Sequence, residues 1–362
     1  MDFFYKTIGR KALFTLDAET AHGASIAGLK AGLHPRADNS ADPRLAVTVP
    51  GLTFPNPLGM AAGYDKGADV PHALMAMGFG HAEVGTITPK PQGGNPKPRV
   101  FRLLRDDGVI NRLGFNSEGH EVVRNRLARH PRVAEHGILG INLGANKTSE
   151  DFAADYVMGV KCFAPLADYL TVNISSPNTP GLRALQGADP LADLLDRVSD
   201  TRDAQSKHVP LFLKIAPDLD QGEMEAIAKA LQASRFDGLI VSNTTLARTG
   251  LKSVNADETG GVSGRPLMER STIALARMAR LMGADFPLIG VGGVFGPRDA
   301  ITKIEAGAHL VQLYTGLIYG GPNLPGKIIK GMGKHMDALG VADWASIRGS
   351  ATDEWAAKTM PS

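Results

Sequence analysis

The fold of this chain is decided by residues 287–316, whose sequence is PLIGVGGVFGPRDAITKIEAGAHLVQLYTG. Two short apolar runs, Pro287–Val291 and His309–Leu313, enclose a helical pattern that begins at Pro297. Proline suits the first turn of a helix. The two runs lack strict alternation, as expected of parallel strands that are buried on both faces. The stretch therefore predicts a strand, a helix and a second, parallel strand.

The same unit recurs along most of the chain. The other expected strands are Leu58–Ala61, His81–Thr86, Ile138–Leu143, Tyr169–Ile174, Leu211–Ile215 and Gly238–Val241. The helical patterns are Asp69–Met77, Glu118–Arg129, Glu150–Phe163, Leu191–Ser206, Gln221–Ser234, Met268–Met282, Pro297–Ala306 and Pro325–Ala338. About eight strand–helix units in this order are typical of the TIM (β/α)8 barrel. We therefore predict an α/β protein whose barrel occupies residues 46–340.

Residues 1–45 do not show this alternation of strands and helices, and their sequence predicts two amphipathic helices. The first mixes apolar and basic residues: Phe3, Phe4, Ile8, Leu13 and Phe14 with Lys6, Arg10 and Lys11. The second begins after Asp17, a favourable N-cap, and carries an apolar stripe of His22, Ile26, Leu29 and Leu33. Such a segment fits a membrane interface, where apolar groups enter the acyl boundary and basic groups meet headgroups. The alternative is a helical cap whose apolar face packs on the barrel.

Two further segments flank the barrel. Val47–Val49 and Leu52–Phe54, on either side of Pro50-Gly51, predict a hairpin that closes the barrel floor. Residues 341–362 form a C-terminal tail for which the sequence predicts neither an element nor a role.

Composition excludes several classes of protein. The net charge is +2 over 362 residues, without the concentrated basic patch that nucleic-acid binding needs, so we expect no nucleic-acid partner. The single cysteine, Cys162, allows neither a disulfide framework nor a multi-cysteine metal site, and it favours a reducing compartment. We expect Cys162 to be a buried packing residue. No apolar run approaches the roughly 18 residues of a transmembrane helix.

Polar residues follow every predicted strand. Because the carboxyl ends of barrel strands form the active-site face, these side chains are expected to converge. The set is rich in amides and hydroxyls and poor in acids. Asparagine offers a donor and an acceptor side by side, which suits the edge of a pyrimidine or flavin ring. A metal site would need clustered His, Asp or Glu, so we expect no metal.

Two glycine-containing turns indicate a phosphate site. Gly292-Gly293 and Thr315-Gly316 follow the last two predicted strands. Their backbone N–H groups can approach a phosphate closely, with a helix N-terminus behind. In this fold the loops after strands seven and eight are the usual phosphate site. We therefore expect a phosphate-bearing cofactor.

The ordered set of these motifs resembles the dihydroorotate dehydrogenases, and specifically the quinone-dependent class 2. The matching blocks are 61–67 (AAGYDKG), 111–116 (NRLGFN), 142–147 (NLGANK), 173–179 (NISSPNT), 242–245 (SNTT), 260–267 (GGVSGRPL), 290–294 (GVGGV) and 314–322 (YTGLIYGGP). Single blocks of this kind are common in proteins. Their full order along nearly the whole barrel is specific to the family.

The resemblance implies ligands and residue roles. It implies FMN bound by Ala62, Gly63, Lys66, Thr86, Asn142, Asn173, Lys214, Ser242, Gly264, Gly293, Tyr314 and Thr315. It implies dihydroorotate, the precursor of orotate, bound by Lys66, Asn111, Arg112, Leu113, Gly114, Phe115, Asn173, Asn178, Asn243 and Thr244. It also implies a membrane quinone as electron acceptor, with a site at His22, Arg102 and Tyr314. We further expect a monomer bound peripherally, through its N-terminal helices, to the cytoplasmic side of the inner membrane.

The resemblance also implies that Ser176 is the catalytic base. The quinone-dependent class carries serine at this position and the soluble class carries cysteine; Cys162 lies elsewhere in the chain. A serine hydroxyl is almost never ionised near neutral pH. A proton taken from substrate C5 must therefore pass onward, through water, as hydride leaves C6.

Each of these assignments has an ordinary alternative. Ser176 before a proline is often only a turn residue, Lys66 suits a solvated loop, and His22 suits simple packing on a helix stripe. Asn116 and Asn146 are expected to be turn formers. The whole chain has three alternatives: a soluble dihydroorotate dehydrogenase using fumarate or NAD, a flavin-free phosphate-binding barrel such as a sugar-phosphate lyase, and a non-catalytic scaffold.

Overall fold

The computed structural model describes residues 5–37, 42–49, 51–129 and 137–361. Eight parallel strands close into a barrel in the order β10-β12-β13-β3-β4-β7-β8-β9. Their bounds are β3 Leu58–Met60, β4 His81–Ile87, β7 Ile138–Leu143, β8 Tyr169–Asn173, β9 Leu211–Ile215, β10 Gly238–Val241, β12 Leu288–Val291 and β13 Leu310–Leu313. The predicted TIM barrel is confirmed, and each strand lies within one or two residues of its expected position.

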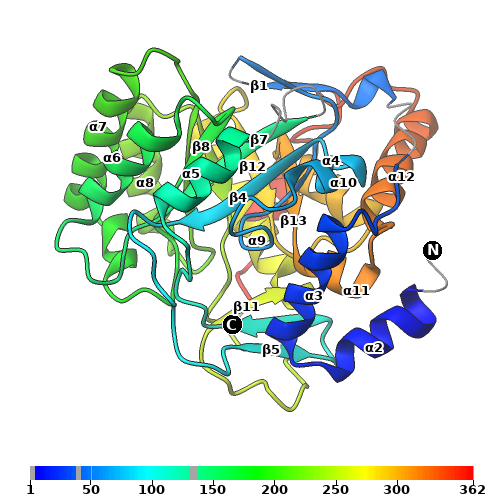
Figure 1. Cartoon of the computed structure of the whole chain (residues 1–362). Coiled ribbons are helices and arrows are strands. Elements are labelled where there is room, and N and C mark those ends of the chain that lie inside the picture. The colour runs from blue at the N-terminus through cyan, green and yellow to red at the C-terminus, as the bar shows by residue number, and fades with distance from the viewer. Residues whose placement is uncertain (1–4, 38–41, 50, 130–136, 362) are drawn as a thin grey trace.

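Helices surround the barrel as expected (Figure 1). They are α4 Pro71–Ala76, α5 His120–Arg129, α6 Phe152–Phe163, α7 Ala188–Asp203, α8 Gln221–Ala233, α9 Met268–Met282, α10 Pro297–Glu305 and α12 Leu324–Leu339. Local sequence explains their starts. Asp220 and Glu223 form a reciprocal capping box on α8, and proline opens α4 and α10. Cys162 on α6 packs against the core, but it is half-buried rather than buried as expected.

A hairpin closes the barrel floor, as the sequence predicted. β1 (Val47–Val49) pairs with β2 (Leu52–Phe54) in antiparallel register. The fully buried ring of Phe54 packs edge-on against His81, with ring centroids 5.2 Å apart. Phe54 also belongs to the apolar cluster inside the barrel that contains Tyr169 and Phe212. Aromatic and apolar side chains therefore fill the floor, and the opposite end of the barrel is left to form the site.

That opposite end carries a three-stranded antiparallel sheet that the sequence did not predict. β5 (Val100–Leu103) and β6 (Gly108–Asn111) form a hairpin, and β11 (Gly261–Gly264) pairs with β6 from far along the chain. Figure 1 shows this sheet beside the N-terminal helices, away from β1. The sheet extends one wall of the barrel mouth.

The N-terminal region forms two helical segments, as predicted. A π-helical turn, η1 (Tyr5–Gly9), leads into α2 (Arg10–Thr15), and α3 (Ala18–Lys30) follows. The Asp17 side chain caps α3 by accepting bonds from Glu19 N and Thr20 N, both at 3.0 Å. Phe3 and Phe4, expected in the first helix, lie outside the described residues. None of the helices in the described ranges has the length and apolar character of a bilayer-spanning segment.

The helical pair is bound to the barrel mouth by charged groups. Glu19 accepts two bonds from Arg99, at 2.6 and 3.1 Å, and Lys30 pairs with Asp69 at 2.8 Å. Arg102 on β5 donates to the carbonyl oxygens of Leu16 and Leu13, at 2.8 and 3.2 Å. The pair is therefore held in place as the cover of the mouth.

The sequence also missed two short helices. α11 (Thr315–Gly320) follows β13 directly, and α13 (Thr352–Ala357) lies in the C-terminal segment and packs against α9. Trp344 and Ile347 of this segment are buried, so residues 341–361 cover part of the outer helical layer.

Candidate active site

A single cavity of about 580 Å³ lies between the barrel mouth, the three-stranded sheet and the helical pair. Most predicted site residues line it: Ala62, Gly63, Lys66, Thr86, Asn111, Leu113, Gly114, Phe115, Asn173, Ser176, Asn178, Lys214, Ser242, Asn243, Thr244, Gly264, Gly293, Tyr314 and Thr315. His22 and Arg102 line its outer part. Residues spread over nearly the whole chain therefore meet at one place.

Asn142 and Arg112 do not line the cavity. Asn142 is fully buried one layer behind it. The Arg112 guanidinium pairs with Glu258 at 2.7 Å, donates to Pro98 O at 3.0 Å and stacks over the Phe101 ring at 4.5 Å. The structure thus gives Arg112 a supporting position beside the site, where the sequence suggested direct contact with substrate.

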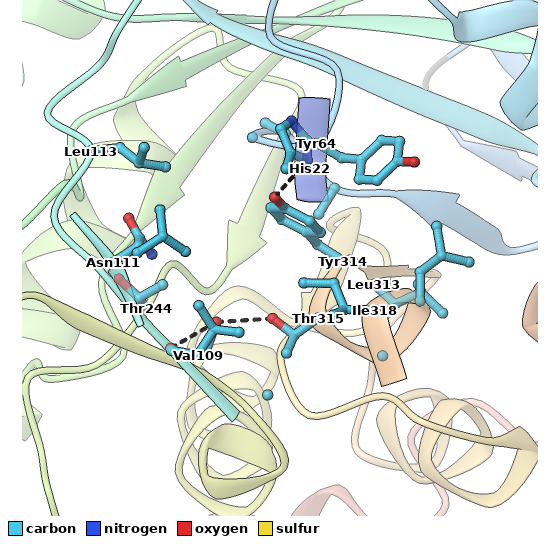
Figure 2. A pocket seen from close by; sticks show the side chains of 18 of the residues that line it. His22, Tyr64, Val109, Asn111, Leu113, Thr244, Leu313, Tyr314, Thr315 and Ile318 are labelled. Carbon is cyan, nitrogen blue, oxygen red and sulfur yellow. Dashed lines mark hydrogen bonds between the residues drawn. The ribbon is translucent and has the colours of Figure 1, made fainter. Parts of the chain in front are cut away.

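The inner end of the cavity forms a backbone cradle. Gly293 has φ +80°, and a Cβ there would come within 2.3 Å of Met268 Cα, so no other residue fits without rearrangement. Within the described part of the chain, the backbone N–H groups of Gly293 and Val294 donate to no protein acceptor. Thr315 Oγ1 donates to Ser263 Oγ at 2.9 Å across the same end (Figure 2). Unpaired N–H groups facing a cavity fit a phosphate.

The barrel interior behind the cavity holds a chain of polar side chains. Asn142 Nδ2 donates to Glu83 Oε1 at 2.7 Å. Asn142 Oδ1 accepts from Thr86 Oγ1 at 2.6 Å and from Asn173 Nδ2 at 3.1 Å. Asn173 Nδ2 also donates to Thr86 Oγ1 at 3.3 Å. These bonds fix which way each amide faces, because a flipped amide would put an oxygen opposite an oxygen.

Lys214 is a buried ammonium that reaches the cavity. Its side chain is 6% exposed, and Nζ lies 3.7 Å from Glu83 Oε1, too far for a hydrogen bond. Among the residues that the structure describes, the contact of Nζ with Glu83 is an ion pair without a hydrogen bond, and Nζ has no hydrogen-bond acceptor. Its hydrogens are therefore available to a ligand. An electron-rich ring edge that gains negative charge fits such a position.

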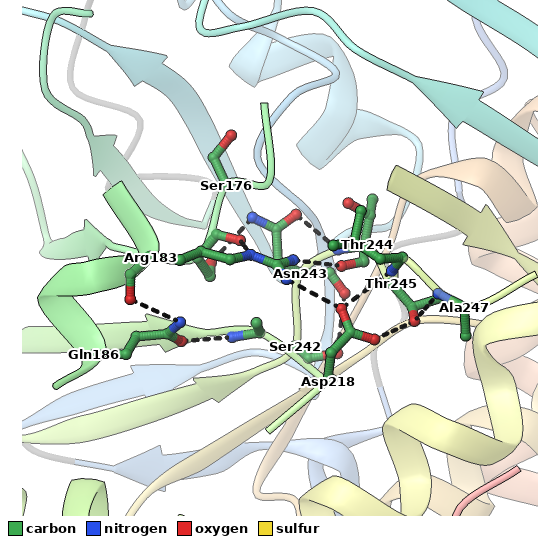
Figure 3. A network of polar contacts seen from close by, with 12 residues as sticks. Ser176, Arg183, Gln186, Asp218, Ser242, Asn243, Thr244, Thr245 and Ala247 are labelled. Atoms are coloured by element: carbon green, nitrogen blue, oxygen red, sulfur yellow. Dashed lines mark hydrogen bonds and ion pairs between the residues drawn. The ribbon is translucent and has the colours of Figure 1, made fainter. Parts of the chain in front are cut away.

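Ser176 lies on the loop after β8, in a network that the sequence did not predict (Figure 3). Its hydroxyl accepts from Asn178 N at 3.2 Å and points away from the network toward the cavity. Behind it, Ser175 Oγ donates to Asn173 Oδ1 at 2.7 Å and accepts from Asn243 Nδ2 at 3.0 Å. Ser176 is 5% exposed, so it is shielded from bulk solvent.

An ion pair supports this loop from below. Arg183, on the 3-10 helix η4 (Leu182–Gln186), donates to Ser175 O at 3.2 Å and lies 3.3 Å from Asp218. Asp218 also accepts from Leu246 N at 3.1 Å and from the Thr245 hydroxyl. The pair therefore joins the loops after β8, β9 and β10. No local pattern marks these two residues, because their roles depend on contacts between separate loops.

Lys66 faces the cavity from the loop after β3. Burial lowers the pKa of Lys66 to about 8; the nearby Glu19 carboxylate opposes this shift and Arg99 adds to it. The loop itself is fixed by Asp65, whose carboxylate accepts from Asp69 N at 2.7 Å and Val70 N at 2.8 Å. Near neutral pH the Lys66 ammonium fits a carboxylate ligand.

His22 and Tyr314 meet at the outer end of the cavity (Figure 2). His22 Nδ1 lies 3.4 Å from Tyr314 Oη, and the His22 ring packs edge-on against Tyr64 at 5.3 Å. Burial, together with Lys66, lowers the pKa of His22 to about 4. His22 is therefore neutral at physiological pH and suits an uncharged ligand. Arg102, the third residue expected here, lines the cavity while its guanidinium holds the helical pair.

The described residues contain no cluster of His, Cys, Asp or Glu that could hold a metal ion. The fold and the site together define a TIM-barrel protein with a cavity at the carboxyl end of its strands, lined by unpaired backbone N–H groups, amides and hydroxyls that fit a phosphate and a planar polar ring.

Comparisons with known proteins identify the family. The model of the dihydroorotate dehydrogenase family matches residues 44–336. Relatives named dihydroorotate dehydrogenase (quinone) from Brucella ovis and Brucella melitensis biotype 2 are 57% and 56% identical over 365 aligned positions, which cover 99% of this chain and 100% of each relative. The ligand-free dihydroorotate dehydrogenase of Eimeria tenella superposes with TM-score 0.89 at 40% identity, covering 92% of this chain and 99% of that one. Its complex with ferulenol gives the same TM-score.

This chain belongs to the dihydroorotate dehydrogenase family, and its full-length relatives place it in the quinone-dependent class. Membership in the family implies a flavin cofactor.

The environment of Lys66 makes a prediction about its titration. Lys66 should titrate near pH 8, well below the ordinary lysine value of about 10.4. Glu19→Gln removes the carboxylate that favours the charged form, so the midpoint should fall further. Carbon-13 NMR of reductively methylated lysines measures it. Glu225→Gln, an exposed charge change on α8, should leave the midpoint where it is. A Lys66 midpoint above pH 10 would contradict the buried environment described here.

Proposed function

We propose that this protein oxidises dihydroorotate to orotate in pyrimidine biosynthesis, with FMN as the first electron acceptor and a membrane quinone as the final one. Quinone-dependent relatives that match over the full length support this activity. The observation that carries the proposal is the convergence of three groups on one cavity: the Gly293 turn, the Lys214 ammonium, which lies 3.7 Å from Glu83 without a hydrogen bond, and the shielded Ser176 hydroxyl.

FMN fits the inner part of the cavity. The unpaired N–H groups of Gly293 and Val294 would hold its phosphate, with Gly264 and Thr315 alongside. Thr86 and Asn173, oriented by Asn142, would bind polar ring atoms, with Ala62, Gly63, Lys66, Ser242 and Tyr314 completing the lining. Bound FMN would supply the acceptor for the hydride that leaves substrate C6. Lys214 would place a positive charge beside the flavin ring and would favour its reduction.

Dihydroorotate fits between the FMN region and the loop after β8. The Lys66 ammonium would bind its carboxylate. Amides and a hydroxyl would bind the polar edges of its ring: Asn111, Asn173, Asn178, Asn243 and Thr244. Leu113, Gly114 and Phe115 would close one side of the ring, supported from behind by Arg112.

Ser176 would take the proton from substrate C5. Its hydroxyl faces the cavity, and the network through Ser175, Asn243 and Arg183 fixes the loop that carries it. Because a neutral serine is a weak base, Ser176 must release its own proton to water as it accepts the substrate proton. Ser176 is shielded from bulk solvent, so this water would have to reach it through the cavity.

The quinone would enter from the outer end, where the helical pair lines the cavity. Leu13 and Phe14 present apolar surface there, and neutral His22 and Tyr314 supply weak polar contacts for a carbonyl oxygen. Arg10 and Lys11 on α2 would face anionic headgroups. We place the protein as a peripheral monomer on the cytoplasmic side of the inner membrane; the free thiol of Cys162 is consistent with a reducing compartment.

The alternatives differ from this proposal in specific ways. A soluble dihydroorotate dehydrogenase would carry cysteine at position 176 and would not need the helical pair. A flavin-free phosphate-binding barrel has no use for Lys214, whose hydrogens face a ring-sized cavity without a protein acceptor. A non-catalytic scaffold would not need so many polar side chains around one enclosed cavity.

The proposed activity predicts a yellow protein. The purified chain should carry one FMN, which bleaches when dihydroorotate is added without oxygen. An acceptor screen with soluble quinone, fumarate and NAD should give turnover with quinone alone. Absorbance spectra and flavin chromatography measure the cofactor. A colourless protein that stays inactive after FMN is supplied would refute the proposal, and turnover with fumarate or NAD would assign the soluble type of reaction.

Ser176→Ala should slow reduction of the bound FMN by about 10²–10⁴-fold, because it removes the general base. FMN content should not change, since the proposed FMN contacts lie elsewhere. Ser176→Cys is the matched control: a thiol ionises at lower pH than a hydroxyl, so its reduction rate should rise with pH through the thiol pKa and level off. Stopped-flow absorbance measures each rate. Reduction of the Ala variant at the parent rate would exclude Ser176 as base.

Two glycines of α3 allow a direct test of the quinone entrance. A Cβ at Gly28 meets no atom within 4 Å and faces the cavity, so Gly28→Phe should fill the outer cavity without disturbing the helix. Turnover with a long-tailed quinone should fall by about tenfold or more, while FMN reduction by dihydroorotate should keep its rate. Gly23→Phe, equally unobstructed but exposed to solvent, should change neither. Steady-state and stopped-flow assays separate the two half-reactions. Unchanged quinone turnover in Gly28→Phe would rule out this entrance.

A further inference from the structure

Lys303 is a completely buried lysine outside the cavity. It lies on α10 with 0% exposure. In the described part of the chain, no carboxylate forms an ion pair with it. Its Nζ donates instead to Ser271 Oγ at 2.6 Å, Thr272 Oγ1 at 2.8 Å and, more weakly, Met268 O at 3.5 Å. All three acceptors belong to the first turn and a half of α9.

The hydrogen positions favour a charged ammonium. Ser271 Oγ donates to Leu267 O at 2.7 Å, and Thr272 Oγ1 donates to Met268 O at 2.6 Å. Each hydroxyl has only one hydrogen, so both present lone pairs to Lys303. With the Met268 carbonyl, three acceptors surround Nζ, which matches the three hydrogens of an ammonium. Burial lowers the pKa of Lys303 well below its ordinary value, and the Asp299 carboxylate opposes this shift without forming an ion pair with Nζ. A further negative charge nearby would therefore stabilise the buried cation.

The Gly292–Gly293 turn lies directly beyond Ser271. Ser271 Oγ also approaches Gly292 O at 3.2 Å. The peptide bond between these glycines is trans, so its N–H points opposite to its carbonyl. The carbonyl faces Ser271 and Lys303, and the Gly293 N–H faces away from them without a protein acceptor. A Cβ at Gly293 would come within 2.3 Å of Met268 Cα, so the turn packs closely on the start of α9, whose residues hold Lys303.

We propose that Lys303 is a buried counter-charge for the phosphate of the cofactor, held by Ser271 behind the Gly292–Gly293 turn. The inference rests on the proposed FMN site. The positive charge on Lys303 polarises the Gly292 carbonyl, which faces it, and the Gly293 N–H on the other side of the same peptide becomes a stronger donor to an anion. Because Lys303 and Ser271 are both fully buried, the positive field reaches the turn with little screening by water. In return, a bound dianion adds to the compensation that the Asp299 carboxylate provides. Lys303 is a positioning residue in this scheme and does not touch the ligand.

A flavin competition on the holoenzyme tests this role. The protein is equilibrated with mixtures of FMN and riboflavin, which differ only in the phosphate, and the bound flavin is then released and quantified by chromatography. For Lys303→Met, the ratio of bound FMN to bound riboflavin should fall by about tenfold relative to the parent protein. A general loss of stability lowers both flavins together and does not move the ratio. Lys161→Met, the same change of charge at an exposed position of α6, should keep the parent ratio.

Ser271→Ala provides a second variant, since it removes the hydroxyl that holds the ammonium beside the turn but retains the lysine. It should lower the ratio in the same direction, and it decides the matter if Lys303→Met does not fold. A parent-like ratio in Lys303→Met, or in Ser271→Ala where the first variant cannot be purified, overturns the proposal. A parent protein that binds neither flavin overturns the proposed function itself, which distinguishes the two failures.

Discussion

The carboxylate of Glu83 is the group on which the arrangement of the site depends. It is fully buried on β4. Its oxygens accept from Asn142 on β7 at 2.7 Å, Gln312 on β13 at 2.9 Å and Tyr169 on β8 at 3.1 Å, and they lie 3.7 Å from Lys214 on β9. A buried carboxylate is costly unless its lone pairs are filled, so the donors around it are held in one orientation. Five of the eight barrel strands are tied together by one side chain.

The hydrogen bonds of Glu83 also determine how the side chains between it and the cavity are oriented. With its amide nitrogen committed to Glu83, Asn142 can offer only its oxygen to Thr86 and Asn173. Asn173 then has its own oxygen free for Ser175, which receives Asn243 in turn. Each hydrogen bond fixes which atom of the next side chain can donate or accept. The mouth of the barrel is therefore arranged before any ligand arrives, which reduces the reorganisation that binding requires.

The sequence predicted the repeating parts of this structure well, and it predicted poorly whatever depends on distant partners. The strands at 211–215 and 238–241 were found because buried parallel strands are short apolar runs with clear ends. The strand at Gly261–Gly264 was not, because its glycines are stabilised by pairing with β6 about 150 residues earlier. Nearly all the site residues that motif resemblance predicted line one cavity in the structure. The resemblance did not reveal Glu83, Arg183, Asp218 or Lys303, since a buried charge has no local sequence pattern and is recognised only by its surroundings.

The wall that α3 contributes to the cavity consists mainly of small side chains, among them Ala21, Ala24 and Gly28. No barrel strand depends on these positions, and open space lies beyond Gly28. Related proteins can thus differ at these positions and still bind the ring, because the residues that would bind it are held by the hydrogen-bonded interior of the barrel. Compounds that occupy the outer end would then discriminate between species, whereas mimics of the pyrimidine ring would inhibit them all alike.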